Sequence, residues 1–402
     1  MSARIDIKNM LFYLTVILLW FTAFAHYHSE GLNHVAIYVV APLMAIVAWA
    51  QNNKLQPGRW FVWLMILYVW VGLTTVFAFN REVALDEMHR ILGCILFSFT
   101  IAISSQSTKH IPWLYGLYIL LFVCAVAYAK REILPYTTFG EGRITNETLN
   151  ANTLAYYTFF YTFITFLMGE IISSPIWKQV WRVVFFTAIP VVYLVAIATA
   201  SRQVMLICAP LLAFMIVYRY LLSKSTPRWQ KAIAILALVS LFAYALPHAL
   251  EMYQGSQLST RNELSVQEDE RMILLREAVE VGCKHPVFGV GPGNFLLFSS
   301  PHVFSHCTYL ELFANTGIIG ALIYIFIVGA FCLINWKRWR QTHDSTFFCF
   351  LLFGCFYALY QFFYVWYTDN WLISFFILVC THSDTYYRSI IESNTPIPIY
   401  SD

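Results

Sequence analysis

The sequence predicts an all-α, polytopic membrane protein, and its composition and the length of its apolar runs carry this prediction. Of the 402 residues, 59% are hydrophobic and only 12% are charged, whereas soluble domains carry about 25% charged residues. So few charges would not cover a water-facing surface. The apolar runs are close to 20 residues long, which suits membrane-crossing helices and exceeds the strands of a membrane barrel.

Twelve apolar segments have this length, with boundaries good to a few residues. They run near 10–28, 34–51, 59–80, 90–106, 112–129, 153–172, 180–199, 202–222, 229–250, 307–334, 346–364 and 370–384. Only a polar corner at 199–202 separates the seventh from the eighth, so the two could form one broken segment. The first is also compatible with a signal peptide, because Arg4 and Lys8 precede it, but we expect it to be retained.

The distribution of Lys and Arg predicts the orientation of the chain. If the N-terminus is cytoplasmic, most of these cations fall in cytoplasmic loops, while the short outer loops near 29–33 and 365–369 carry none. Both termini are therefore expected in the cytoplasm. The predicted organisation is nine spans over 1–250, one large outer loop over 251–306, and three spans with a cytoplasmic tail over 307–402.

Several classes of function are disfavoured. The net charge is only +3 and no basic stripe is present, so nucleic acid is not an expected partner. No Asp-x-Asp motif or ligand cluster predicts a metal or other cofactor, and His26, His28 and His34 suit the membrane interface better. The glycine-rich run 288–295 lacks the spacing and the preceding strand of a dinucleotide site. A tight turn that lets the backbone approach a neighbour is the favoured interpretation.

The outer loop is predicted to contain a helix over 266–282. Ser265 and Glu268 form a capping box at its start, and acidic residues fill the first turn, where the helix dipole favours them. Gly282 can end the helix, and Pro286 prevents it from continuing.

This helix is amphipathic and carries two arginines on different faces. Its apolar arc contains Met272, Leu274, Leu275, Ala278, Val279 and Val281. Arg276 lies on the opposite, acidic arc, where a solvated ion pair with Glu280 is the favoured interpretation. Arg271 lies near the centre of the apolar arc, where it would either extend to the membrane interface or enter a polar pocket between helices.

Two further residues lie at the same predicted outer face. Arg202 stands at the polar corner between two apolar helices, where interfacial anchoring competes with phosphate binding through its planar, permanently charged fork. His306 directly precedes the tenth span. A role at the start of that helix is the more frequent one, but a histidine can also take a proton near neutral pH.

Together these features resemble the O-antigen ligase and polymerase family of bacterial envelope glycosyltransferases. The resemblance covers about residues 195–320 and rests on the Ser201-Arg202 corner, on Arg271 before the run from His285 to Phe295, and on His306 followed by Gly317 and Gly320. The twelve-span plan with one large outer loop also fits. The sequence departs from the family pattern at Cys307, where Asn, Ser or Gln is usual, which puts in doubt the hydrogen bond made by that residue.

The resemblance implies a reaction at the periplasmic face of the bacterial inner membrane. A polysaccharide would move from undecaprenyl diphosphate to the lipid A–core oligosaccharide in ligases, or to the growing repeat in polymerases. Arg202 and Arg271 would bind the diphosphate, His306 would act as general base, and no metal or other cofactor would take part. Asp369, Arg143 and Arg276 are secondary candidates, and Asp369 could instead cap the helix that follows it.

Other functions and one disulfide stay open. An O-antigen polymerase or a protein O-oligosaccharyltransferase would use the same chemistry, whereas a polysaccharide or lipid transporter should show internal repeats that the sequence lacks. A non-catalytic scaffold is the remaining class. Cys283 and Cys307 both lie near the outer loop, where a disulfide is permitted, although two free thiols are the favoured state.

Overall fold

In the computed structural model, the described residues are 7–52, 56–133, 151–172, 174–199, 204–218, 228, 231, 232, 235 and 270–394. Their regular structure is helical throughout, and no strand occurs in these ranges. The predicted all-α class is therefore confirmed for this part of the chain. Two compact units are present, one formed by 1–117 with 270–402 and the other by 118–269. The predicted segments with boundaries at 250 and 306 stay a prediction.

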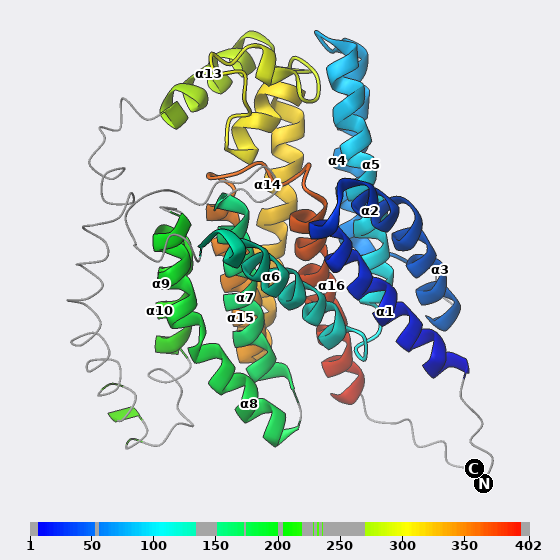
Figure 1. The fold of residues 1–402 in the computed structure, drawn as a ribbon, viewed down its shortest axis with the longest axis vertical. Helices are drawn as coiled ribbons and strands as arrows, with labels where there is room; N and C mark the ends of the chain where they lie inside the picture. Colours follow the sequence, from blue (N-terminus) through cyan, green and yellow to red (C-terminus); the bar gives the residue numbers. More distant parts are fainter. Residues whose placement is uncertain are drawn as a thin grey trace. The chain divides into compact units, whose positions relative to one another are not determined.

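The first unit holds most of the described helices (Figure 1). They are α1 (Ile7–His28), α2 (Glu30–Val35), the π-helical turn Ala36–Val40, α3 (Ala41–Asn52), α4 (Gly58–Thr74), α5 (Arg81–Ser104), the start of α6 (Ile111–Ile133), α13 (Glu270–Lys284), α14 (Thr308–Thr342), α15 (Ser345–Tyr360) and α16 (Asn370–Asn394). Helix α5 packs against α3 and α16, and α14 packs against α4, α13 and α15. Helix α14 is thus in contact with α13, which precedes it in the chain, and with the two helices α4 and α15.

In its described part, the second unit contains the rest of α6 and four shorter α-helices. These are α7 (Ala151–Ile171), α8 (Pro175–Phe186), α9 (Ala188–Thr199) and α10 (Ala209–Ile216). Helix α7 packs against α8 and α9. Residues 200–202 of the predicted corner at 199–202 and almost all of the predicted span 229–250 lie outside the described residues, so the question of one broken segment stays open.

Within the described residues, six helical segments are long and apolar enough to cross a membrane by length and composition. They are Glu30–Gln51, Gly58–Phe77, Arg81–Ser104, Leu154–Ile171, Pro175–Ala196 and Thr308–Thr342. Shorter apolar helices occupy Met10–His26, Ile111–Ala127 and Ser345–Tyr360. The chain is therefore a multi-pass membrane protein, and the full count of twelve spans stays a prediction.

Some helix boundaries differ from those predicted. Helix α5 begins at Arg81 rather than near 90, because the Asn80 side chain accepts hydrogen bonds from the backbone N–H groups of Glu82 (3.0 Å) and Val83 (3.4 Å) and so caps an earlier start. Helix α14 continues to Thr342 and α16 to Asn394, both past the predicted ends of the apolar runs. Hydropathy located the membrane-compatible part of each helix but not its polar extension.

Aromatic residues fill part of the protein interior. The largest fully buried side chains include Trp60, Trp366 and Trp371. Tyr357 stacks on Phe376 with ring centroids 4.5 Å apart and meets Trp366 edge-on at 4.7 Å. These rings fill the interior of the first unit between α15 and α16, and they fix the position of the loop that joins these two helices.

Candidate active site

His306 lies directly before α14, at the end of the predicted outer loop. It is half-buried and has a positive φ of 58°, in the left-handed region that L-residues seldom adopt. Its ring meets Phe304 edge-on at a centroid distance of 4.4 Å, and Phe304 meets Tyr364 at 5.8 Å. The histidine is therefore held among aromatic rings at the start of a helix, and its imidazole is partly accessible.

Ser305 and Glu311 hold the backbone beside His306. The Ser305 hydroxyl donates to the carbonyl oxygen of Cys307 at 3.1 Å and accepts from the Cys307 N–H at 3.3 Å. The Ser305 backbone N–H donates to the Glu311 carboxylate at 2.6 Å. The backbone on both sides of His306 is thus held by hydrogen bonds of Ser305 and Glu311, and the imidazole takes no part in these bonds.

Glu311 and Asn315 extend this network to the glycine-rich loop. The Asn315 side-chain amide donates to Glu311 Oε1 at 2.9 Å, and Asn315 Oδ1 accepts the backbone N–H of Phe295 at 2.8 Å. Glu311 is only 4% exposed and Asn315 is fully buried. A continuous chain of hydrogen bonds therefore runs from Ser305 through the first two turns of α14 to Phe295.

The glycine-rich loop packs its backbone directly on a break in α14. Val290 and Gly291 donate their backbone N–H groups to the carbonyl oxygens of Ala314 (2.9 Å) and Asn315 (2.8 Å). At the break itself, Gly317 has φ 73° and ψ −176°. The prediction of a tight turn that lets the backbone approach a neighbour is confirmed.

The same loop also holds the connection between α4 and α5. The Asn80 backbone N–H donates to Asn294 Oδ1 at 2.7 Å, and Asn294 Nδ2 returns a hydrogen bond to the Asn80 carbonyl at 3.1 Å. Phe79 donates its N–H to the Val290 carbonyl at 2.9 Å. Three segments far apart in the sequence are thereby joined around the start of α14.

Helix α13 confirms the predicted amphipathic helix, with changes at its ends and on its face. The described part begins at Glu270, so the predicted capping box lies outside it, and the helix ends at Lys284 rather than at Gly282. Its buried stripe is narrower than the predicted apolar arc. Leu274, Ala278 and Val281 are buried, whereas Met272 and Val279 are 41% and 40% exposed.

This buried stripe packs on α14 and on the glycine-rich loop. Its neighbours are Leu310 and Ala314 of α14 and Val290 and Phe295 of the loop. At Gly282 the helices are so close that a Cβ would overlap the ring of Phe313. Glu277 accepts hydrogen bonds from the backbone N–H (3.1 Å) and the hydroxyl of Ser300, in the segment leading to His306.

The arginines predicted on α13 lie in different environments. Arg271 is half-buried and lies one turn before Leu274, at the end of the packed stripe, whereas Arg276 is exposed. No ion pair joins Arg276 to Glu280 among the described residues, so that part of the prediction is wrong. The structure brings the helix that carries Arg271 against the helix that follows His306. Arg202 and Arg143 lie outside the described residues.

Asp369 caps α16. Its Oδ1 accepts from the backbone N–H groups of Trp371 (3.0 Å) and Leu372 (3.1 Å), so the capping interpretation is confirmed. Burial raises the pKa of this carboxyl to about 6. The loop before it is tied to the start of α14, because the Thr308 hydroxyl donates to the Tyr364 carbonyl at 2.7 Å. The predicted catalytic contribution of Asp369 stays a prediction.

Sequence reasoning missed Glu311 and Glu87, the other acids near this junction. Glu87 of α5 lies near Thr368, next to Asp369, and close enough to Glu311 to influence it electrostatically. An acid inside a predicted membrane span is by itself a signal for function. That signal was available for Glu311, while Glu87 carried none because it lay between predicted spans.

No group of three His, Cys, Asp or Glu side chains is arranged to hold a metal ion in the part of the chain that the structure describes. His26 instead accepts a hydrogen bond from the Trp371 indole at 3.2 Å. Cys283 is exposed and Cys307 is buried, and both are free thiols, as favoured from the sequence.

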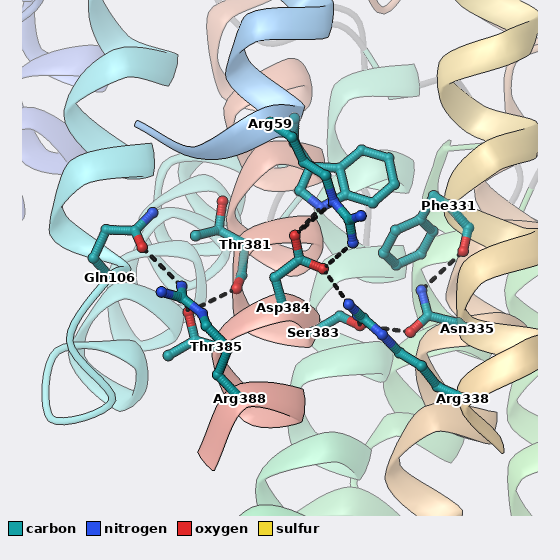
Figure 2. Close-up of polar contacts among 11 residues, drawn as sticks. Arg59, Gln106, Phe331, Asn335, Arg338, Thr381, Ser383, Asp384, Thr385 and Arg388 are labelled. Atoms are coloured by element: carbon teal, nitrogen blue, oxygen red, sulfur yellow. Dashed lines mark hydrogen bonds and ion pairs between the residues drawn. The ribbon is translucent and has the colours of Figure 1, made fainter. Parts of the chain in front are cut away.

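A second polar cluster lies at the other end of α14. Asp384 of α16 accepts two hydrogen bonds from Arg59, at 2.9 and 2.6 Å, one from the Trp60 indole at 3.0 Å and one from Arg338 at 2.7 Å (Figure 2). Arg338 also donates to the Ser383 hydroxyl at 2.9 Å. The Asp384 carboxylate is therefore paired with cations from α4 and α14. The cluster joins these two helices to α16 and is a structural contact.

A comparison with protein families supports the resemblance drawn from the sequence. Residues 183–325 match the model of the family described as O-Antigen ligase. The matched range includes Arg202, Arg271, His306 and the glycine-rich loop with the break in α14 on which it packs. No match was found among curated proteins.

Proposed function

Because residues 183–325 match the O-antigen ligase family, we propose that the chain is a membrane glycosyltransferase that ligates O-antigen. It transfers a polysaccharide from undecaprenyl diphosphate to the lipid A–core oligosaccharide. The reaction takes place at the periplasmic face of the bacterial inner membrane, with both termini of the chain in the cytoplasm. A membrane-embedded enzyme suits a donor whose leaving group carries a lipid tail.

The observation that carries this proposal is the position of His306. A half-buried imidazole at the start of α14, beside the helix that carries Arg271, is placed to meet a substrate. Transfer requires a base that removes the proton from the acceptor hydroxyl as the new glycosidic bond forms. Histidine suits this role because its ordinary pKa lies near neutral pH.

The departing diphosphate requires positive charge. As the bond from the sugar to phosphate breaks, negative charge builds on the phosphate oxygens, and fixed cations stabilise it. Arg271 and Arg202 are the proposed cations, because a guanidinium fork forms two parallel hydrogen bonds with a phosphate. Since arginines carry this charge in the proposal, purified enzyme should remain active in EDTA. Activity lost in EDTA and restored by magnesium would contradict the metal-independent mechanism.

The decisive test is the lipopolysaccharide of a strain that lacks the gene. A ligase predicts that core without any O-antigen remains while lipid-linked polymer accumulates. Core bearing a single repeat would instead indicate a polymerase. Unchanged lipopolysaccharide with a loss of glycan from a protein would indicate a protein O-oligosaccharyltransferase. Complementation with His306→Ala, checked for membrane expression, links the outcome to the proposed site.

A further inference from the structure

His306 is held in a backbone conformation that an L-residue adopts only under external constraint. Its φ is 58°, and non-glycine residues in the left-handed region persist only where their surroundings hold them. Such positions concentrate at functional sites. The contacts that hold this one are therefore candidates for residues that act through the histidine.

Ser305 supplies the immediate constraint. Its hydroxyl contacts both backbone polar groups of Cys307, at 3.1 and 3.3 Å, so the chain on either side of His306 is joined across the histidine. These two hydrogen bonds hold the backbone of His306 in place only if the Ser305 backbone is itself anchored. The anchor is Glu311, whose carboxylate accepts the Ser305 N–H at 2.6 Å.

Glu311 is an expensive anchor if stability were its only role. It is 4% exposed, and among the described residues no Lys or Arg forms an ion pair with it. A buried carboxyl group without a cation is unfavourable, and a neutral side chain could also accept the Ser305 N–H. A carboxyl group in this buried place has two oxygens that accept from two different donors, Ser305 and Asn315, and this geometry indicates a role beyond packing.

Asn315 couples this anchor to the glycine-rich loop. It donates to Glu311 Oε1 at 2.9 Å and accepts from the Phe295 N–H at 2.8 Å, so it holds the carboxylate in one rotamer. We propose that Glu311 is a positioning residue that, oriented by Asn315, sets His306 in the geometry needed to take a proton from the acceptor. The inference rests on the proposed transferase function for its catalytic meaning.

The hydrogen-bond directions allow an exchange experiment. In Glu311→Gln the new NH2 group can only donate a hydrogen bond, yet it must face another donor, either the Ser305 N–H or the Asn315 amide. In the double variant Glu311→Gln/Asn315→Asp the introduced amide donates to the introduced carboxylate, which still accepts from Phe295. The double exchange therefore keeps a hydrogen bond at each of the three links from Ser305 through residues 311 and 315 to Phe295, whereas each single variant breaks one.

The first readout is steady-state transfer by purified protein in proteoliposomes. Glu311→Gln and Asn315→Asp should each lower kcat about 10–100-fold with little change in the KM for the lipid-linked donor, because a misplaced base slows the chemical step. The double variant should recover most of the loss. Thr316→Val is the matched control, since among the described residues the hydroxyl of this buried neighbour bonds only within its helix, to the Leu312 carbonyl at 2.7 Å. The backbone bond from the Trp70 indole to the Thr316 carbonyl is kept, and kcat should equal that of the wild type.

The second readout does not require activity. Diethyl pyrocarbonate modifies accessible imidazoles, and peptide mass spectrometry gives the rate at each histidine. Relative to His302 in the same loop and His343 at the far end of α14, the rate at His306 should change in Glu311→Gln and return in the double variant. The two reference histidines also have positive φ values, 54° and 55°, so they control for backbone conformation.

The outcomes separate the two proposals. If the wild type transfers glycan but Glu311→Gln matches it in kcat and in His306 reactivity, the positioning role is overturned while the transferase function stands. A double variant as impaired as the singles, or a loss of activity that follows the melting temperature, also overturns it. If the wild type transfers no glycan, the transferase function fails, and the reactivity of His306 still decides whether Glu311 positions it.

Discussion

Gly317 of α14 and Val287 of the glycine-rich loop lie so close that a Cβ on Gly317 would overlap the Val287 carbonyl oxygen. The backbone at Gly317 has a φ of 73°, and the helix is broken there. Next to the break, the Ile318 N–H donates to the Pro286 carbonyl at 2.9 Å. The loop thus takes the hydrogen bonds that an unbroken helix would have made.

Gly317→Ala should destabilise the protein by at least about 2 kcal/mol, because alanine is strained at this φ and its methyl group meets backbone that has no room to move. The measurement is the unfolding midpoint in detergent. Gly329→Ala is the matched control in the same helix, since nothing lies within 4 Å of a Cβ there. If both variants melted like the wild type, the close packing of loop and helix would be contradicted.

His306→Ala should abolish transfer while leaving donor binding largely intact. Loss of a general base costs about 10²–10⁴-fold in rate, whereas the proposed diphosphate contacts do not involve the imidazole. His302→Ala, in the same loop and exposed, should retain activity. Turnover of the His306 variant at the wild-type rate would exclude this residue as the base.

Arg271→Ala and Arg202→Ala should both weaken use of the donor, and Lys should substitute poorly at either position. A point charge does not reproduce the two parallel hydrogen bonds of a guanidinium on phosphate. Arg276→Ala, which removes an exposed arginine from the same helix as Arg271, should be nearly silent. An essential Arg276 together with a dispensable Arg271 would reverse the assignment of the two faces of α13.

Asp369→Asn should remove one component of the pH dependence of stability. The Asp369 pKa is raised from 3.8 to about 6 in the folded protein, so its stabilising contribution is complete below about pH 4 and is lost as the pH rises through 6. Asparagine still caps the helix but does not ionise. Between pH 4 and 7 the wild type should therefore lose about 1–2 kcal/mol relative to the variant. Parallel melting curves across this range would contradict the shifted pKa.

Arg338→Gln should destabilise the protein more than Arg59→Gln does. Both arginines bind Asp384, but the Arg338 side chain is 9% exposed and that of Arg59 is 41% exposed. Breaking a buried pair costs about 3–5 kcal/mol, and exposed pairs contribute about 0–1 kcal/mol. Arg90→Gln breaks the pair with Glu87 at a side chain that is 73% exposed, so it serves as the control with almost no effect. Equal losses for Arg338 and Arg59 would contradict the burial argument.

The membrane class, the helices and the candidate residues could be read from the sequence because each depends on local patterns. An apolar run of sufficient length predicts a membrane helix wherever the chain goes next. The periodicity of 266–282 identified an amphipathic helix and separated Arg271 from Arg276. The stripe that packs is narrower than the arc, since burial depends on the width of the partner surface and not on hydrophobicity alone.

Only the tertiary structure decided which residues hold one another. Arg59 and Asp384 are 325 residues apart in the sequence, and Asn80 and Asn294 are 214 apart, so no local pattern could pair them. The positive φ of His306 and the hydrogen bond from Ser305 to Glu311 arise because the glycine-rich loop packs on a broken α14. The sequence alone determined the kinds of group present at the outer face, and packing between distant segments determined their geometry.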